Sequence, residues 1–439
     1  MKLSDIQNGT YNPQEWADKG YQLPKFDMKA VRQKTHDEPT WLHFGAGNIF
    51  RAFPAAVLQN VLDTGSYDRG VIVAEGFDFE IIDKAYRPYG DMSLLVVLKS
   101  DGSIEKKVVA SVTESLKADP QFGEDWARLE EIFQKPSLQM VSFTITEKGY
   151  SVAPADLERG LTPALIMGKV TALLYRRYQA GALPLTVQSM DNCSHNGDKV
   201  KAAAFTYAEA WVKAGLVDQG FLDYLKDESK ITFPWSMIDK ITPRPDAQVQ
   251  DLLAKDGFED NYTIITEKRT YTAPFVNAEE TEYLVIEDKY TNGRPPLEKG
   301  GVLYVDRETV DNVERMKVCT CLNPLHTAMS IYGCLLGYTL ISAEMADEDL
   351  RGLITKMGYQ EAMPVVVDPG VLKPADFIDA VLTKRLPNPF MPDAPQRIAT
   401  DTSQKLSIRF GETIKAYQAK GLDMSGLVLI PMVLAGYAR

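Results

Sequence analysis

Short apolar runs alternate with amphipathic stretches over the first half of the chain. The runs are rich in Val, Ile and Phe, which is typical of buried strands, and the stretches between them have apolar residues at helical spacing. The predicted strands are residues 41–44, 70–74, 93–99, 107–112, 139–146 and 185–189, and the predicted helices are 52–62, 126–134 and 164–180. Because strands alternate with helices, we expect an α/β fold with a doubly wound, mostly parallel sheet.

From about residue 311 the pattern changes to longer helical segments. The predicted helices there are 313–322, 326–337, 348–357, 375–386, 403–420 and 427–438, after strand-like pieces at 262–266 and 283–287. The first 38 residues lack clear periodicity and are expected to form an irregular arm. We therefore predict two domains, residues 1–305 and a mainly helical domain over residues 306–439.

The acidic balance of the chain limits its partners. Its 439 residues include 48 basic and 60 acidic ones, a net charge of −12. This argues against nucleic-acid and anionic-membrane binding, since both need a basic face. The first 24 residues lack the apolar core of a secretion signal. The apolar stretch 427–438 is too short to span a membrane, so it is expected to be a buried helix.

The cysteines and histidines show no metal-binding pattern. Cys193, Cys319, Cys321 and Cys334 lack the paired two-residue spacing of zinc sites, and the four histidines are scattered. Without a secretion signal, the cysteines are interpreted as reduced thiols of a cytoplasmic protein that needs no metal.

Gly45-x-Gly47 lies between a predicted strand and a predicted helix. The first glycine allows a tight turn, and the second lets the N–H groups at the helix start, near Asn48 and Ile49, approach a pyrophosphate. The third position of the dinucleotide pattern is Phe50, so an ordinary strand–helix turn is the alternative. Arg51 is expected either to contact a phosphate or to form a surface ion pair.

An acidic residue, Glu75, ends the second strand of the predicted sheet. A carboxylate there would accept from the ribose hydroxyls of NAD and repel the 2′-phosphate of NADP. Because no basic residue lies between Glu75 and Ile82, the sequence favours NAD, although Glu75 alone could be a solvated loop acid.

Several polar motifs run in one order along the chain. They are Gly45-x-Gly47-x-x-x-Arg51, Thr144-Ile-Thr146-Glu147-Lys-Gly149-Tyr150, Ser189-x-Asp191-Asn192-x-x-x-Asn196-Gly197, Met237-Ile-Asp239-Lys240-Ile-Thr242-Pro243, Lys317 before Asn323-x-x-His326, and Arg397-x-x-x-Asp401-x-Ser403-x-Lys405. Together they resemble the long-chain mannitol dehydrogenase family of polyol and sugar-acid dehydrogenases. The resemblance implies a Rossmann-like N-terminal domain, a helical C-terminal domain, and metal-independent hydride transfer between a secondary alcohol and a ketone.

The resemblance also implies roles for individual residues. Lys317 is expected to be the general base of oxidation and the general acid of reduction. Asn192 and Asn323 are expected to stabilise the developing alkoxide, and His326 to orient the substrate. The remaining contacts implied are Asp239, Arg397 and Lys405 to the substrate, and Thr146 and Glu147 near the nicotinamide ribose.

The resemblance, together with cationic candidates near the site, favours a sugar-acid substrate, with D-fructuronate and D-mannonate as the expected pair. These candidates are Arg294, Arg397 and Lys405, which could pair a carboxylate. A polyol substrate such as mannitol, or tagaturonate, is the alternative, and a silent nucleotide-binding protein is the alternative outside enzymes. Arg397 could also form a routine helix pair with Asp401. From the family, a monomer or homodimer is expected.

The spacing between Lys317 and Asn323 departs from the family, which has four residues between lysine and asparagine where this chain has five. In a regular helix the family spacing places the two side chains about 140° apart, and this spacing about 240° apart. We therefore predict a π-bulge or a helix break, with Asn323 as the N-cap of a helix that has Pro324 at its first position.

Two smaller departures accompany it. Lys240 replaces the family's arginine, which keeps the charge but loses a bidentate fork. Family members continue past the helix that ends near Arg439, so we expect either a short variant or a sequence that lacks its final segment.

Overall fold

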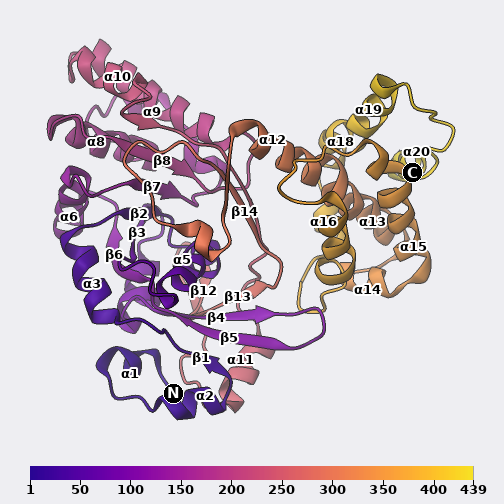
Figure 1. Ribbon diagram of the computed structural model, residues 1–439, viewed down its shortest axis with the longest axis horizontal. Helices are drawn as coiled ribbons and strands as arrows, with labels where there is room; N and C mark the ends of the chain where they lie inside the picture. Colours follow the sequence, from indigo (N-terminus) through magenta and orange to yellow (C-terminus); the bar gives the residue numbers. More distant parts are fainter. Residues whose placement is uncertain (439) are drawn as a thin grey trace. The chain divides into compact units, whose positions relative to one another are not determined.

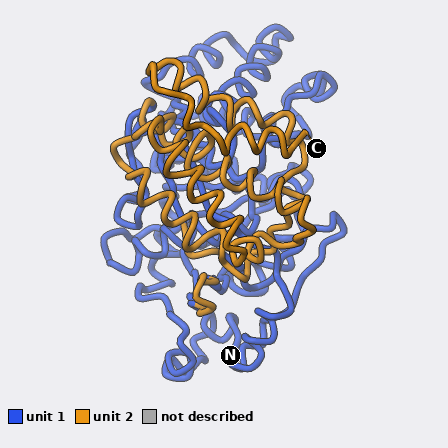
Figure 2. Tube along the Cα trace, turned by 90° about the vertical axis from the view of Figure 1, so that its right-hand side faces the viewer, with its two compact units in different colours: residues 1–97, 105–278, 282–307 blue, residues 98–104, 279–281, 308–439 orange. Residues whose placement is uncertain are grey.

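The computed structural model describes residues 1–438, and the chain divides into two compact units (Figures 1 and 2). Unit 1 comprises residues 1–97, 105–278 and 282–307. Unit 2 comprises residues 98–104, 279–281 and 308–439. Residues 98–104 and 279–281 of unit 2 lie within the range predicted for the first domain.

The centre of unit 1 is a six-stranded parallel sheet. Its strands lie in the order β6 (Val112–Lys117), β3 (Val71–Glu75), β2 (Trp41–Phe44), β7 (Met140–Phe143), β8 (Leu185–Ser189) and β9 (Ile231–Thr232). This is the strand order of a doubly wound dinucleotide-binding fold, as predicted. The order reverses between β2 and β7, and ligands of such sheets bind where the strands on either side of that reversal end.

Helices cover both faces of this sheet, because side chains along each strand alternate between two cores. Leu42 and Phe44 pack into one core and Trp41 into the other. The first core is covered by α6 (Gly123–Gln134), α8 (Ile166–Gln179), α9 (Asn196–Lys213) and α10 (Gln219–Lys226), and the second by α4 (Asn48–Ala52) and α5 (Pro54–Asp63). Strands β2, β3, β7 and β8 are buried throughout, which explains their continuous apolar runs.

Smaller sheets complete unit 1. They have the orders β1 (Tyr21–Gln22)-β5 (Ile104–Val109)-β4 (Ser93–Leu98)-β13 (Phe275–Glu279), β10 (Ser236–Asp239)-β14 (Tyr283–Glu287)-β15 (Leu303–Val305) and β11 (Ile264–Ile265)-β12 (Tyr271–Thr272). The single strand predicted at 107–112 is wrong, because the chain turns at Ala110 and Ser111 between β5 and β6, which belong to different sheets.

The irregular arm predicted over the first 38 residues is also wrong. This region forms α1 (Leu3–Asn8), α2 (Pro13–Asp18) and α3 (Met28–Asp37). Caps mark two of these helices: Asn12 accepts from the N–H of Gln14, and Asp27 accepts from those of Lys29 and Ala30. Helices α1 and α2, of six residues each, are too short for apolar periodicity to reveal them.

The long segment of unit 2 is helical, as predicted, but several helices contain π-helical turns. The α-helices are α12 (Arg307–Met316, which begins at the unit boundary), α13 (Asn323–Leu336), α14 (Ile341–Ala346), α15 (Glu348–Lys356), α16 (Pro374–Ala380), α17 (Pro395–Ala399), α18 (Thr402–Leu406), α19 (Glu412–Lys420) and α20 (Leu429–Ala438). The π-helical turns are η5 (Lys317–Cys321), η6 (Met357–Ala362), η8 (Val381–Arg385) and η9 (Ser407–Gly411).

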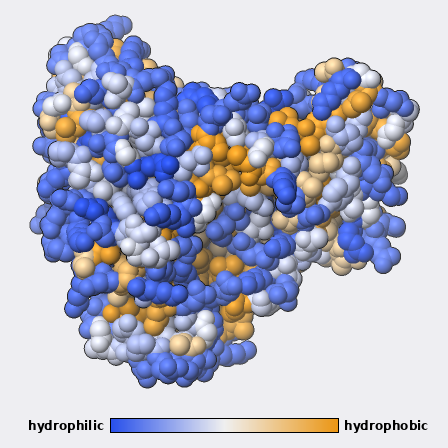
Figure 3. All heavy atoms as spheres, in the orientation of Figure 1, coloured by the Kyte–Doolittle hydropathy of each residue, from blue (hydrophilic) through white to orange (hydrophobic). Residues whose placement is uncertain are grey.

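The last helix is less buried than predicted. Ile430 and Val433 of α20 are buried, whereas Val428, Met432 and Tyr437 are exposed. Figure 3 shows apolar side chains at the surface in this part of unit 2. The helix therefore packs through one side only. Among the described residues, no helix combines the length and apolar character needed to cross a membrane.

Candidate functional site

The glycine turn lies where the strand order of unit 1 reverses. Gly45 follows β2 with a φ of +108°, and a Cβ there would lie 2.2 Å from the carbonyl oxygen of Thr144, which follows β7. Only glycine fits this close approach of two backbones. Gly45 thus allows the backbone after β2 to lie against the backbone after β7, and these two strand ends border the expected ligand position.

Gly47 leaves open space in front of a helix. Its φ is −76°, and a Cβ there would meet no atom within 4 Å. Helix α4 begins directly after it, four residues earlier than the helix predicted from 52, and Asn48 and Ile49 are partly exposed. Their N–H groups precede the first intrahelical bonds, so they are donors for an anion. The turn therefore fits a dinucleotide pyrophosphate.

Glu75 is buried and holds this turn. Its carboxylate accepts from the backbone N–H of Ala46 at 2.8 Å, Phe77 at 2.8 Å and Asp78 at 3.1 Å. Burial raises the pKa of Glu75, and the three hydrogen bonds partly oppose that shift. The alternative of a solvated loop acid is therefore wrong. A carboxylate offers about four acceptor positions, so one remains for a ribose hydroxyl.

Arg51 does not lie at the surface of unit 1. Its guanidinium is buried and donates to the carbonyl of Ala273, to Thr272 and to Asn48. Both sequence expectations, a phosphate contact and a surface ion pair, differ from this arrangement. The buried charge instead ties α4 to the segment around β12, which leaves backbone N–H groups as the anion donors of the turn.

A strained residue, Thr146, follows β7. Its φ is +65°, which costs a non-glycine residue of order 1–3 kcal/mol. Asp191, after β8, compensates by accepting from the N–H of Ile145 at 2.9 Å and of Thr146 at 2.8 Å, and it also accepts from the hydroxyl of Tyr150. Burial raises the pKa of Asp191. The sequence motif contains Asp191, but no role was predicted for it. Its position after a buried strand could have indicated one.

The neighbouring predicted residues lie near these strand ends. Thr146, Glu147 and Asn192 are exposed, and Glu147 pairs with Lys199 at 2.9 Å. The loop that carries Asn192 is anchored by Asn196, whose amide bonds Ser236 of β10. That same strand ends at the buried Asp239. The loop and β10 therefore hold Asn192 and Asp239 on one connected framework.

Unit 2 places Lys317 at the first residue of the π-helical turn η5, where its side chain is buried. The N–H of Leu322 donates to the carbonyl of Lys317 at 3.1 Å, the i to i+5 bond of a π-turn. The predicted π-bulge is confirmed. Such a turn absorbs one extra residue, so Asn323 regains approximately the orientation that the family spacing gives it.

The predicted cap at Asn323 is wrong. Leu322, with φ −127° and ψ −65°, precedes the helix, while Asn323 is its first residue and Pro324 its second. The π-turn runs to Cys321, so only Leu322 departs from helical geometry. The side chain of Asn323 is therefore not needed as a cap.

His326 lies one turn further along α13. Its Nε2 is buried, has no hydrogen-bond partner among the described residues, and lies 3.6 Å from Asp393. Burial, together with nearby arginines, lowers the pKa of His326 to about 4, against the opposing effect of Asp393. The imidazole is therefore neutral at pH 7, which leaves Nε2 for a substrate hydroxyl.

Two of the cations expected to contact the substrate, Arg397 and Lys405, lie in unit 2. Arg397 is largely exposed and pairs with Asp393, not with Asp401 as the helix-pair alternative held. Lys405 donates to the carbonyl of Thr400 at 2.6 Å. Burial and the nearby Arg409 lower the pKa of Lys405. Sequence reasoning missed Arg409, although it lies four residues after Lys405.

Two cations of unit 1 are already paired. Arg294 forms ion pairs with Asp288 and Glu298 and stacks 3.5 Å above the ring of Tyr304, so its expected role at a substrate carboxylate is wrong. Lys240, the replacement for the family's arginine, is buried against Glu282 at 2.6 Å.

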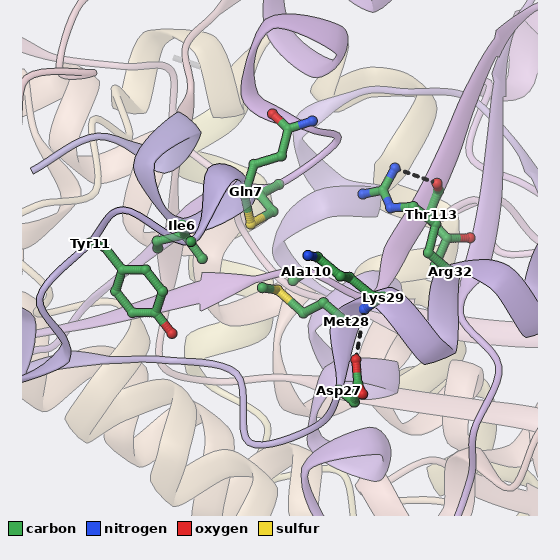
Figure 4. A pocket seen from close by; sticks show the side chains of 11 residues that line it. Ile6, Gln7, Tyr11, Asp27, Met28, Lys29, Arg32, Ala110 and Thr113 are labelled. Carbon is green, nitrogen blue, oxygen red and sulfur yellow. Dashed lines mark hydrogen bonds between the residues drawn. The ribbon is translucent and has the colours of Figure 1, made fainter.

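A cavity of unit 1 is formed by the N-terminal helices. It measures about 260 Å³, and its lining includes Gln7, Tyr11, Lys29, Arg32 and Thr113 (Figure 4). Arg32 donates to Thr113 and Gly90 and pairs with Asp91, so its charge is already compensated and does not require an anionic ligand. Within the described residues no cluster of three His, Cys, Asp or Glu side chains could hold a metal ion.

Two family models match the chain. "Mannitol dehydrogenase Rossmann domain" matches residues 39–299, and "Mannitol dehydrogenase C-terminal domain" matches residues 309–439. The chain is 51% identical to "D-mannonate oxidoreductase" of Thermotoga maritima, over 97% of this chain and 80% of that protein. It is 30% identical to "Polyol:NADP oxidoreductase" of Gluconobacter oxydans, over 90% of this chain and 78% of that protein.

Solved structures share the fold. A D-sorbitol dehydrogenase in substrate-free form aligns with a TM-score of 0.80 and 27% identity, covering 95% of this chain and 82% of that one. Mannitol 2-dehydrogenase of Pseudomonas fluorescens, in complex with NAD and D-mannitol, aligns with a TM-score of 0.73 and 24% identity, covering 97% of this chain and 83% of that one.

Proposed function

Because the chain belongs to the mannitol dehydrogenase family, we propose that it is an NAD-dependent oxidoreductase acting on a sugar acid, with D-mannonate and D-fructuronate as its alcohol and ketone. The observation that carries the proposal is the 51% identity to a D-mannonate oxidoreductase over almost the whole chain. The geometry of unit 1 supports the nucleotide, through the open space at Gly47 and the buried acid Glu75.

The residues of unit 1 have binding roles in this proposal. The N–H groups after Gly47 hold the pyrophosphate, and the remaining acceptor position of Glu75 receives a ribose hydroxyl. Thr146 and Glu147 lie beside the nicotinamide ribose. When bound, NAD supplies the site that accepts the hydride of the alcohol.

The residues of unit 2 move the proton and hold the substrate. Lys317 takes the proton of the reacting hydroxyl in oxidation and returns it to the ketone oxygen in reduction. Asn323 donates a hydrogen bond to the developing alkoxide. His326, neutral at pH 7, orients a neighbouring hydroxyl. Arg397 and Lys405 bind the distal part of the substrate.

A polyol is the second candidate substrate. The Gluconobacter relative is named for polyols and NADP, and several mannitol 2-dehydrogenases match at 27–30% identity. The lysine spacing raises the further alternative of a silent nucleotide-binding protein. The π-turn at Lys317 favours the enzyme over this alternative, since such a turn absorbs the extra residue between Lys317 and Asn323.

Steady-state reduction of fructuronate, tagaturonate and fructose tests the substrate, with NADH and NADPH in parallel. We expect fructuronate with NADH to give the highest kcat/KM. Preference for fructose would support the polyol candidate. Binding of NADH without turnover of any of the three would contradict the enzyme assignment.

We also propose a cytoplasmic monomer or homodimer. The four cysteines are free, which suits a reducing compartment. Light scattering after gel filtration gives the oligomeric state, and a tetramer or larger assembly would contradict this part of the proposal.

A further inference from the structure

A partly buried guanidinium of unit 2 lies beside the proposed substrate residues. Arg409 belongs to the π-turn η9 and follows Lys405 by four residues, so the two side chains leave the helix on the same side. Arg409 also donates to the hydroxyl of Thr327, the neighbour of His326 on α13. The guanidinium of Arg409, which η9 carries, therefore lies beside Thr327 and His326 of α13.

Among the described residues, Arg409 has no carboxylate partner, unlike two other arginines of unit 2. Arg397 pairs with Asp393, and Arg385 pairs with Glu279 at 2.6 Å. In the part of the chain that the structure describes, no carboxylate lies within ion-pair distance of Arg409. Burial lowers its pKa, as expected for a desolvated cation. A partly desolvated charge without a counter-charge is less favourable than a paired one, so an anion from outside the chain would stabilise this position.

We propose that Arg409 binds the carboxylate of the substrate and thereby sets the preference for a sugar acid over a polyol; this inference rests on the proposed function. The bond to Thr327 uses Nη1. The edge formed by Nε and Nη2 remains for the two oxygens of a carboxylate, the geometry that makes arginine selective for this group. A neutral polyol has no group that matches this edge. Arg409 is thus a specificity residue rather than a proton-transfer residue.

Kinetics with a charged and a neutral substrate test the assignment. Arg409→Gln and Arg409→Lys are compared with wild type, using fructuronate and fructose with NADH. For fructuronate, we expect Arg409→Gln to raise KM about 10- to 100-fold with little change in kcat, since one charge-assisted pair is lost. Arg409→Lys should recover part of this loss, because it keeps the charge without the fork. For fructose, the kcat/KM of both variants should match that of wild type.

The control is Lys420→Gln, which removes an exposed positive charge from the end of α19. It should leave the KM for fructuronate unchanged. If Arg409→Gln does not fold, wild-type inhibition gives the answer: D-gluconate should compete with fructuronate more strongly than neutral D-sorbitol does. That difference should shrink as KCl is raised.

Two results separate failure of this inference from failure of the proposed function. In the first, wild type prefers fructuronate, but Arg409→Gln changes the KM for fructuronate and fructose equally or changes neither KM. Arg409 is then not the carboxylate partner, and the proposed function stands. Equal inhibition by gluconate and sorbitol has the same meaning. If wild type itself prefers fructose, the sugar-acid function fails, and the role of Arg409 fails with it.

Discussion

The two units fix their site residues by different means. In unit 1, Gly45 and Thr146 follow parallel strands: the N–H of Gly45 donates to the carbonyl of Ala74, and the N–H of Thr146 donates to the carboxylate of Asp191. In unit 2, Lys317 and Arg409 lie in π-turns that interrupt helices. A strand end is set by the sheet and allows little adjustment. A π-turn reorients the side chains of a helix through one extra residue, so the second arrangement can change a site without changing the fold.

Buried carboxylates show the same contrast. Glu75 of unit 1 accepts from three backbone N–H groups. Glu344 of unit 2 is fully buried on α14, and neither of its oxygens has a hydrogen-bond partner among residues 1–438. A Cβ on Gly333 of α13 would lie 1.8 Å from one of these oxygens. Unit 1 thus uses its buried acid to hold the site, whereas unit 2 contains one whose surroundings destabilise the ionised form.

The largest expected effect separates chemistry in unit 2 from binding in unit 1. Lys317→Ala should lower kcat by about 1,000-fold or more, since general acid–base catalysis contributes up to about 10⁴-fold. NADH affinity, measured by fluorescence titration, should stay within about twofold of wild type because the nucleotide residues lie in unit 1. Retained turnover would exclude Lys317 as the proton-transfer residue.

The second prediction compares the two glycines of the turn. Gly45→Ala should weaken NADH binding by about 10- to 100-fold and lower stability, because it combines a positive φ with an overlap of backbone and side chain. Gly47→Ala is the matched variant: it should keep wild-type stability, since its φ is ordinary and its surroundings are open. It should still weaken NADH binding if the pyrophosphate occupies that space. Thermal unfolding with and without NADH separates the two effects, and equal loss of stability in both would contradict this account of the turn.

The strand framework of unit 1 could be predicted because its local signal is strong. The ranges predicted at 41–44, 185–189 and 283–287 match β2, β8 and β14, since short buried runs between turns have few other solutions. The helix α9 was not predicted, although Ala204, Ala208 and Trp211 repeat at helical spacing on its buried side. Helices α1 to α3 depend on caps and on packing, which a periodicity search does not detect.

The site could be predicted in part, through motif order and helix geometry. The extra residue after Lys317 was enough to predict the π-turn. The sequence could not give the partners of the cations, because several carboxylates lie at suitable spacing. Arg397 pairs with Asp393 rather than Asp401, and Arg294 pairs with Asp288. Which pairs form depends on tertiary packing, and so does the lack of a counter-charge that distinguishes Arg409.

The third prediction concerns the unpartnered acid of unit 2. Burial raises the pKa of Glu344 from 4.5 to about 8. The unfolded chain therefore releases this proton above about pH 4.5, whereas the folded chain retains it to about pH 8. Stability should fall through that window by about 1.4 kcal/mol per pH unit from this group alone. Glu344→Gln should remove that slope, giving a variant that is more stable than wild type at pH 8 by urea unfolding.

Glu361 provides the matched control. It is also buried in unit 2, but it accepts from the backbone N–H of Val428, Leu429 and Ile430 at the start of α20. Glu361→Gln should therefore destabilise the protein by about 1–2 kcal/mol. If Glu344→Gln destabilised it similarly at pH 8, Glu344 would have a partner that compensates its charge.

The smallest expected effect tests the contrast itself. If η5 only absorbs the residue that exceeds the family spacing, deletion of Cys319 should convert the turn to regular α-helix and leave Lys317 and Asn323 facing as before. We expect kcat to stay within about tenfold of wild type. Deletion of Ala328, inside the regular helix α13, should instead rotate all following residues by about 100° and abolish folding or activity. Equal loss in both deletions would mean that the π-turn is itself required, and that a helix in this unit is as intolerant of change as the strand ends of unit 1.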